Sequence, residues 1–304
     1  MVAQAGLSLV LLVAAGLLIV SLRNLERQSF GFETEGRLIV RVRPASAGYK
    51  FDQLPTLYRQ LQDQLSQIPG VRSASLALTS PMAGWNFQTP VFIEGHAPAT
   101  NPAEDLSFYD FVSAHFFDTI GNKVTRGRPL DEQDTPNSHH VTVVNETFAR
   151  KFLPNQDPIG HHLGISDASH GGDYEIVGVA QDAKFTSAKN PAVPMFFMPL
   201  LQIETYKDQD DMAYQIWANY IDTIQLRVVG RPENYQRVVQ QTLADIDPNL
   251  TVRKMMTFRG FGQREFQQFE ADGAVDDGVR GCGAAASGDR VVRRGSVHSG
   301  KADK

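Results

Sequence analysis

The sequence predicts an α+β protein in which an N-terminal transmembrane helix precedes two β-α-β units, with a β-rich subdomain inserted between the units. Three observations support this fold class: an uncharged apolar run at the start, two similar strand–helix–strand patterns far apart in the chain, and a strand-rich segment between them. Two such units can share one sheet with both helices on one face, as in the split β-α-β or ferredoxin-like arrangement. The shared sheet would bury the apolar stripe of each helix.

The first element is the apolar run at residues 2–22, which contains no charged side chain. At about 1.5 Å per residue, a helix of this length spans roughly the 30 Å hydrocarbon core of a bilayer. A cleaved signal peptide would have a basic start and a shorter apolar core, and a buried soluble helix is the other alternative. We therefore expect an uncleaved membrane helix. Arg23 and Arg27 follow it, and this charge signal alone would keep the next segment in the cytoplasm.

The first half of the paired units covers residues 30–86. Its predicted elements are a strand over 37–43, a helix over 51–68 and a strand over 71–78. The helix is predicted because its apolar side chains recur every three or four residues and form one stripe. Asp52 is the expected N-cap, and Pro69 with Gly70 ends the helix.

The second half covers residues 221–258 and repeats the pattern. Its predicted elements are a strand over 223–229, a helix over 233–246 and a strand over 250–255. Two units of similar length and order indicate an internal duplication.

The segment between the halves, residues 87–220, is predicted to be an inserted β-rich subdomain. Its predicted strands are 91–94, 141–144 and 174–179, and a short helix over 145–152 is capped by Asn145. The apolar run 194–199 favours core or edge-strand packing over an exposed docking patch. The two ends of the insertion should lie close together, because both join the same small sheet.

Composition excludes several classes of function. The chain has 304 residues, about two domains by length, and 34 acidic against 29 basic side chains give a net charge of −5, which argues against nucleic-acid binding. A single cysteine, Cys282, excludes an internal disulfide framework and a multi-thiolate metal site. Neither a phosphate-binding G-x-x-x-x-G-K-[ST] loop nor a G-x-S-x-G nucleophile motif occurs. We predict no enzyme, no cofactor and no catalytic, cofactor-binding or metal-binding residue.

If the prediction of no metal-binding residue is wrong, the histidines are the strongest candidates for metal ligands. They are His139, His140, His161, His162 and His170, with Asp173 close in sequence. Adjacent residues of a strand point to opposite faces, whereas chelating histidines usually have a spacing that brings both rings to one side. We therefore favour solvated or hydrogen-bonded loop histidines over a metal site formed by converging loops.

Two further segments are predicted to be irregular. The acidic run Asp208, Asp210 and Asp211 lacks the spacing of a calcium loop and is expected to be a solvated loop. Residues 270–304 contain no large apolar side chain and are expected to be disordered. Our hypothesis for this tail is an out-of-frame reading of a GC-rich gene, which would make the chain a truncated protein.

Several sequence segments, in order along the chain, resemble the periplasmic core domain of MacB-type ABC transporter permeases, in particular FtsX-like permeases of acidobacteria. These segments are residues 2–36, 68–71, 108–128, 143–150, 157–160, 175–182, 199–200 and 247–248. The resemblance covers about residues 2–258. It implies a porter-like half made of two β-α-β units with a second subdomain inserted between them. It also implies Leu-rich membrane helices from about residue 269 onwards, which this sequence lacks.

The resemblance implies a non-catalytic, membrane-anchored subunit that couples a separate cytoplasmic ATPase to periplasmic movement or export. It places the main domain in the periplasm, at the inner membrane of a bacterium, against the charge signal of Arg23 and Arg27. The implied partners are the lipid bilayer, the ATPase, further permease segments and a periplasmic adaptor, with no nucleic acid. Two alternatives remain: a membrane-tethered extracytoplasmic ligand-binding or sensor module, and a metal-dependent hydrolase that would use the histidines and that metal analysis with His161→Ala and His170→Ala would test.

Overall fold

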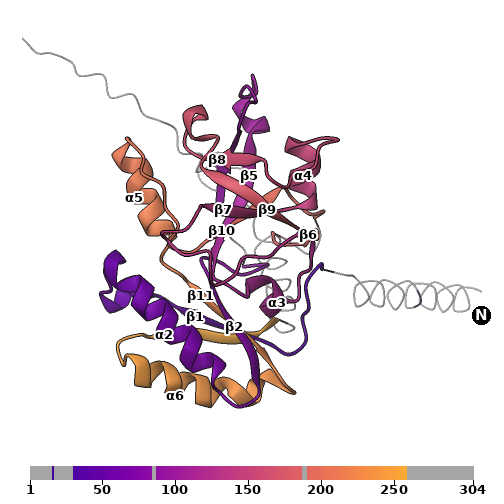
Figure 1. Ribbon diagram of the computed structural model, residues 1–304. Helices are drawn as coiled ribbons and strands as arrows, with labels where there is room; N and C mark the ends of the chain where they lie inside the picture. The colour runs from indigo at the N-terminus through magenta and orange to yellow at the C-terminus, as the bar shows by residue number, and fades with distance from the viewer. Residues whose placement is uncertain (1–15, 17–29, 84–86, 187–189, 259–304) are drawn as a thin grey trace, which may run out of the picture. The chain divides into compact units, whose positions relative to one another are not determined.

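A computed structural model describes residues 30–83, 87–186 and 190–258, together with Gly16 (Figure 1). Residues 30–258 fall within one compact unit. The membrane helix predicted at 2–22 and the tail predicted at 270–304 lie outside the described residues, Gly16 excepted. Within the described part of the chain, no helix has both the length and the apolar character needed to cross a membrane.

The described strands form one mixed sheet. The strands are β1 (Arg37–Val42), β2 (Val71–Ala77), β3 (Phe87–Pro90), β4 (Phe92–Ile93), β5 (Leu106–Val112), β6 (Val124–Gly127), β7 (Val141–Asn145), β8 (His162–Gly164), β9 (Tyr174–Ala180), β10 (Met195–Pro199), β11 (Thr223–Val228) and β12 (Val252–Thr257). The helices are α2 (Leu54–Ser66), α3 (Phe116–Ile120), α4 (Glu146–Phe152), α5 (Gln209–Ala218) and α6 (Gln236–Ile246). The main path of the sheet runs β12-β1-β11-β2-β5-β10-β7-β9-β8-β4, with β3 paired to β5 and β6 paired to β9.

The four strands β12-β1-β11-β2 are all antiparallel to their neighbours and have the order of a ferredoxin-like sheet. Helices α2 and α6 contact each other and pack on β2 and β12, so both cover the same face (Figure 1). This confirms the predicted pairing of two β-α-β units on one sheet. We call these four strands and two helices the porter-like lobe.

The remaining strands, β3 to β10, with α3, α4 and α5 form what we call the inserted lobe. Its sheet is mixed, because β10 is parallel to β5, β7 is parallel to β9 and the other pairs are antiparallel. The two ends of the insertion lie together, as expected, since the rings of Phe87 and Trp217 are 5.3 Å apart. The boundaries of 87–220 themselves remain a prediction.

Strand β1 is buried on both faces. On β1, Leu38 and Val40 face the apolar cluster of α2 and α6, whereas Ile39 faces a second cluster on the opposite side. Helix α3 of the inserted lobe covers that opposite side and contacts β2 and β11. The period-two pattern of this strand therefore separates two cores rather than a core from solvent.

Some local predictions need correction. Asp52 does not cap the first helix, because a 3-10 turn at Phe51–Gln53 precedes α2 and Gln53 occupies the N-cap position. The acidic run is not a loop: α5 starts within it, and the Asp208 carboxylate accepts a hydrogen bond from the Asp210 amide at 2.8 Å. A carboxylate in that position satisfies a free amide of the first turn, which favours a helix.

Two other local predictions hold. Asn145 caps α4, since its Oδ1 accepts a hydrogen bond from the Phe148 amide at 2.8 Å. The apolar run 194–199 contributes β10, whose five residues are all buried. This strand lies between β5 and β7, so it is an interior strand rather than an edge strand or an exposed patch.

Candidate functional site

Two features of the fold are candidates for a site: a cleft where the lobes meet, and a histidine cluster at the far end of the inserted lobe. The cleft has a volume of about 670 Å³ and is lined by α2, β2, the segment after β5, and residues around 130–136 and 199–201. Charged side chains of both signs line it, among them Arg59, Asp63, Arg72 and Asp118. The cleft can therefore accommodate a polar ligand or a partner's side chains.

Beside the cleft, the two lobes are joined through backbone pairing of β2 with β5, and this backbone joint is short. Strands β2 and β5 share one register pair, Ala77 with Val112, whereas β1 and β11 share five. The Ser113 hydroxyl reinforces the joint, because it accepts hydrogen bonds from the Leu76 amide at 2.9 Å and from Gln62 Nε2 at 3.0 Å. One side chain thus connects β2, α2 and the end of β5.

A buried carboxyl group lies next to this joint. Asp110 on β5 is fully buried, and its Oδ1 accepts a hydrogen bond from the Thr79 amide at 3.1 Å. Its Oδ2 has no hydrogen-bond partner among the described residues. Burial raises the pKa of the Asp110 carboxyl well above its ordinary value, and the backbone hydrogen bonds only partly oppose that effect. Asp110 is not among the residues that line the cleft.

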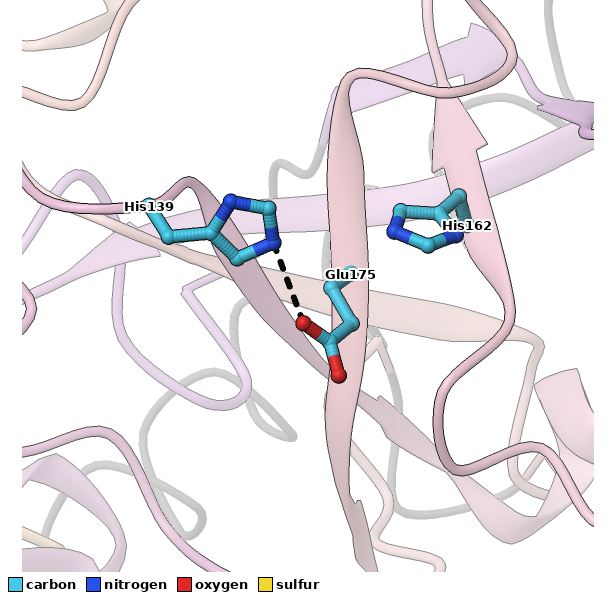
Figure 2. Close-up of side chains that lie close together, drawn as sticks. All are labelled: His139, His162 and Glu175. Atoms are coloured by element: carbon cyan, nitrogen blue, oxygen red, sulfur yellow. Dashed lines mark ion pairs between the residues drawn. The ribbon is translucent and has the colours of Figure 1, made fainter.

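The histidine cluster consists of His139, His162 and Glu175, whose ligand-capable atoms all lie within 4.8 Å of one another (Figure 2). His162 on β8 and Glu175 on β9 are direct partners across an antiparallel strand pair. His139 precedes β7, the parallel neighbour of β9 on its other side, where the Glu175 amide bonds the His140 carbonyl. Three adjacent strands thus bring the three side chains to one place.

The other histidines lie elsewhere. His140 stacks on Tyr174 with a ring separation of 5.5 Å and pairs with Glu204. His170 hydrogen-bonds Asp173 at 2.8 Å and packs edge-on against the ring of Tyr206. The side chain of His170 is therefore hydrogen-bonded and that of His140 is paired with a carboxylate.

His161 stands just before β8, where its amide bonds the Pro158 carbonyl at 3.2 Å. His161 and His170, the positions named for test substitutions, do not share a metal-ligating group in the described part of the chain. The structure instead assembles a group that spacing arguments missed, because they did not include the pairing of β8 with β9. The prediction that no residue binds metal is not tested by this geometry.

Comparisons with known proteins agree with the fold. Residues 5–267 match the family of MacB-like periplasmic core domains. The periplasmic region of MacB from Actinobacillus actinomycetemcomitans is similar with a TM-score of 0.51 at 12% identity, covering 81% of this chain and 98% of that chain. The extracellular domain of the noncanonic ABC-type transporter YknZ from Gram-positive bacteria has a TM-score of 0.44 at 9% identity, covering 73% and 98%.

No curated protein sequence matches the chain significantly. The family match extends over most of the described residues and includes both lobes. The chain therefore belongs to the family of MacB-like periplasmic core domains, which are periplasmic domains of ABC transporter permeases.

Proposed function

We propose that this chain is the periplasmic domain of an ABC transporter permease subunit, held at the inner membrane of a bacterium by residues 2–22. In this role it carries out no bond chemistry. It transmits movement, driven by a separate cytoplasmic ATPase, to an export step on the periplasmic side. Membership of the family supports the general role, and the way the lobes are packed supports the mechanical one.

The observation that carries the proposal is the continuity of packing between the lobes. The two apolar clusters each contain side chains of both lobes: Leu38 and Phe196 belong to one, Ile39 and Phe197 to the other. Close-packed interiors resist gradual deformation and move between discrete arrangements. A domain with two shared cores would therefore be displaced as one body, which is what transmission of a movement from the membrane requires.

The partners follow from this role. Further permease segments would complete the membrane part, and a periplasmic adaptor would receive the movement. Helix α5 presents exposed aromatic side chains, Tyr214 and Trp217, whose rings stack at 5.8 Å. Exposed aromatic groups are common at protein interfaces, so this helix is a reasonable place to look for adaptor contacts.

Location and partnership can be tested together in cells that produce the full chain. We expect the chain in the inner-membrane fraction, degraded by protease added to spheroplasts and protected in intact cells. We also expect the ATPase encoded beside its gene to co-purify in mild detergent. A chain with residues 2–22 replaced by a cleaved signal peptide is the matched control for anchoring. Recovery of the full chain in the soluble fraction would contradict the proposal.

The cleft favours a second candidate function, that of a ligand-binding or sensor module. Arg59, Arg72, Asp63 and Asp118 all line the cleft, and charges of both signs would suit a small polar ligand. A small molecule that raises the melting temperature of the full chain, and loses this effect in Arg72→Ala, would support that function. A full chain that co-purifies with the ATPase and shows no ligand-dependent melting would leave the permease role as the better explanation.

A further inference from the structure

We propose that the inserted lobe binds one divalent transition-metal ion between His139, His162 and Glu175. Two imidazole nitrogens and one carboxylate oxygen form a ligand set that suits Zn²⁺ and related ions, with the fourth position open to water. The three ligand-capable atoms already lie within 4.8 Å of one another, and His139 Nε2 is 3.0 Å from Glu175 Oε2. This inference does not depend on the proposed transport function.

The backbone holds two of the three ligands in fixed positions. His162 and Glu175 face each other across the β8–β9 pair, so their side chains leave the sheet on the same side. Strand β9 also pairs with β7 along its other edge, which makes it an interior strand. Ligands on paired strands lose little conformational freedom when an ion binds, because the strands already restrict them.

A second carboxylate orients the ring of His162. Its Nδ1 lies 3.1 Å from Glu94 Oε2, which leaves Nε2 as the nitrogen available to an ion. Figure 2 shows the rings of His162 and His139 on opposite sides of the Glu175 carboxylate, each with a nitrogen toward the space between them. Metal-binding histidines commonly donate their other N–H to a carboxylate in this way, which fixes the tautomer. Glu94 and Glu175 also supply the negative charge that a dication needs.

The third ligand, His139, leaves the site open to solvent and can move when an ion binds. The His139 side chain is 64% exposed and precedes β7 in a loop, so the site opens to solvent. Ligand atoms around tetrahedral Zn²⁺ are about 3.3 Å apart, given bond lengths of about 2.0 to 2.1 Å. The largest contraction required is therefore about 1.5 Å, which rotation of the exposed His139 side chain and of the half-buried His162 and Glu175 side chains would provide. The bound ion would replace the His139–Glu175 ion pair and link three adjacent strands.

The test uses the full 304-residue chain, purified without a polyhistidine tag and treated with a chelator to remove bound metal. This protein is titrated with ZnCl₂ in a calorimeter. Co²⁺ serves as a second probe, since its visible absorption reports coordination by nitrogen and oxygen ligands. We expect one ion per chain and a dissociation constant at least tenfold weaker in His162→Ala and in Glu175→Gln. Glu94→Gln, which keeps all three ligands, should weaken binding by about tenfold to a hundredfold.

Two further variants keep the result interpretable. His139→Ala alters only an exposed loop side chain, so it should fold normally and still lose at least tenfold in affinity. His161→Ala removes the neighbouring histidine outside the cluster and should bind as the unaltered chain does. The proposal is overturned if the full chain binds neither ion, if binding survives unchanged in His139→Ala and His162→Ala, or if His161→Ala weakens it equally.

Discussion

The porter-like lobe and the inserted lobe differ in how regular their strand pairing is and in how clearly the sequence reveals their elements. In the porter-like lobe all strand pairs are antiparallel, and each helix connects two strands of its own unit. In the inserted lobe β5 lies parallel to β10, although about 80 residues separate them in the chain. Distant pairing builds both lobes, since about 180 residues separate β1 from β11. Local periodicity reveals the porter-like lobe because its strand–helix–strand pattern occurs twice, whereas the inserted lobe has no such repeat.

The lobes also show that a narrow backbone joint does not imply loose attachment. Strands β2 and β5 share a single register pair, yet both apolar clusters continue from one lobe into the other. Helix α3 of the inserted lobe lies against β2 and β11 of the porter-like lobe. Side-chain packing, rather than backbone pairing, therefore connects the two regions, and Phe116→Ala and Ser113→Ala test that conclusion directly.

The largest effect is expected for Phe116→Ala in α3. Phe116 is completely buried, and its ring lies 5.8 Å from that of Phe197. Removal of this ring should lower the free energy of unfolding by about 3 to 5 kcal/mol, because it leaves a cavity between the lobes. Urea unfolding of the full chain measures the loss, with the half-exposed Val238→Ala as control. Two separate unfolding transitions in the unaltered chain would contradict shared packing.

A smaller loss is expected for Gly70→Ala, which tests the porter-like lobe alone. Gly70 has φ of +89°, and an added Cβ would lie 2.1 Å from the Tyr235 hydroxyl. Backbone strain and this clash should together cost about 1 to 3 kcal/mol. Gly230→Ala is a matched control, since Gly230 has φ of +76° with nothing within 4 Å of the added Cβ. If the two variants lose equal stability by chemical denaturation, the clash contributes nothing.

The buried Asp110 predicts a dependence of stability on pH. Its pKa is raised in the folded state, so above its ordinary pKa the unfolded chain releases a proton that the folded chain retains. Stability should therefore fall as pH rises through this window, by up to about 1.4 kcal/mol per pH unit, until the folded pKa is reached. Asp110→Asn should remove this slope and be the more stable form at neutral pH.

The comparison requires urea unfolding of both proteins at several values between about pH 4 and pH 8. Asp63→Asn, at an exposed position of α2, is the control for the loss of one carboxylate. A stability difference between Asp110→Asn and the unaltered chain that does not vary with pH would show that the carboxyl group is not protonated in the fold.

The smallest effect is expected for Ser113→Ala at the backbone joint. The variant removes the hydroxyl that accepts hydrogen bonds from the Leu76 amide and from Gln62. A loss of about 1 kcal/mol is expected for bonds of this kind, well below that of Phe116→Ala. Ser66→Ala at the exposed end of α2 is the control. A loss as large as that of Phe116→Ala would show that the joint, not the packing, holds the lobes together.

Much of the porter-like lobe could be predicted because its signals are local. Apolar side chains three or four residues apart indicated both helices, and Gly70 and Pro69 marked the end of the first. Asn145 was identified as a cap for the same reason, since a cap acts within three residues. The failure at Asp52 is also local: a 3-10 turn moved the start of the helix from the predicted residue 51 to Leu54, and such shifts do not change the apolar stripe.

The histidine cluster could not be predicted, because it depends on strand pairing. His162 and Glu175 meet only in one register of β8 against β9, and a slip of one residue would move one of them to the other face. His139 joins them because β7 is the parallel neighbour of β9. A spacing rule for a single strand or helix contains none of this information.

The interleaving of the two β-α-β units also has a consequence for synthesis of the protein. Both neighbours of β1 come from the second unit, since β1 pairs with β11 and β12. About 180 residues must leave the ribosome after β1 before its first partner exists. At about 5 to 20 residues per second, that strand remains unpaired for roughly 10 to 40 seconds. During that time its apolar side chains are a natural binding site for a chaperone.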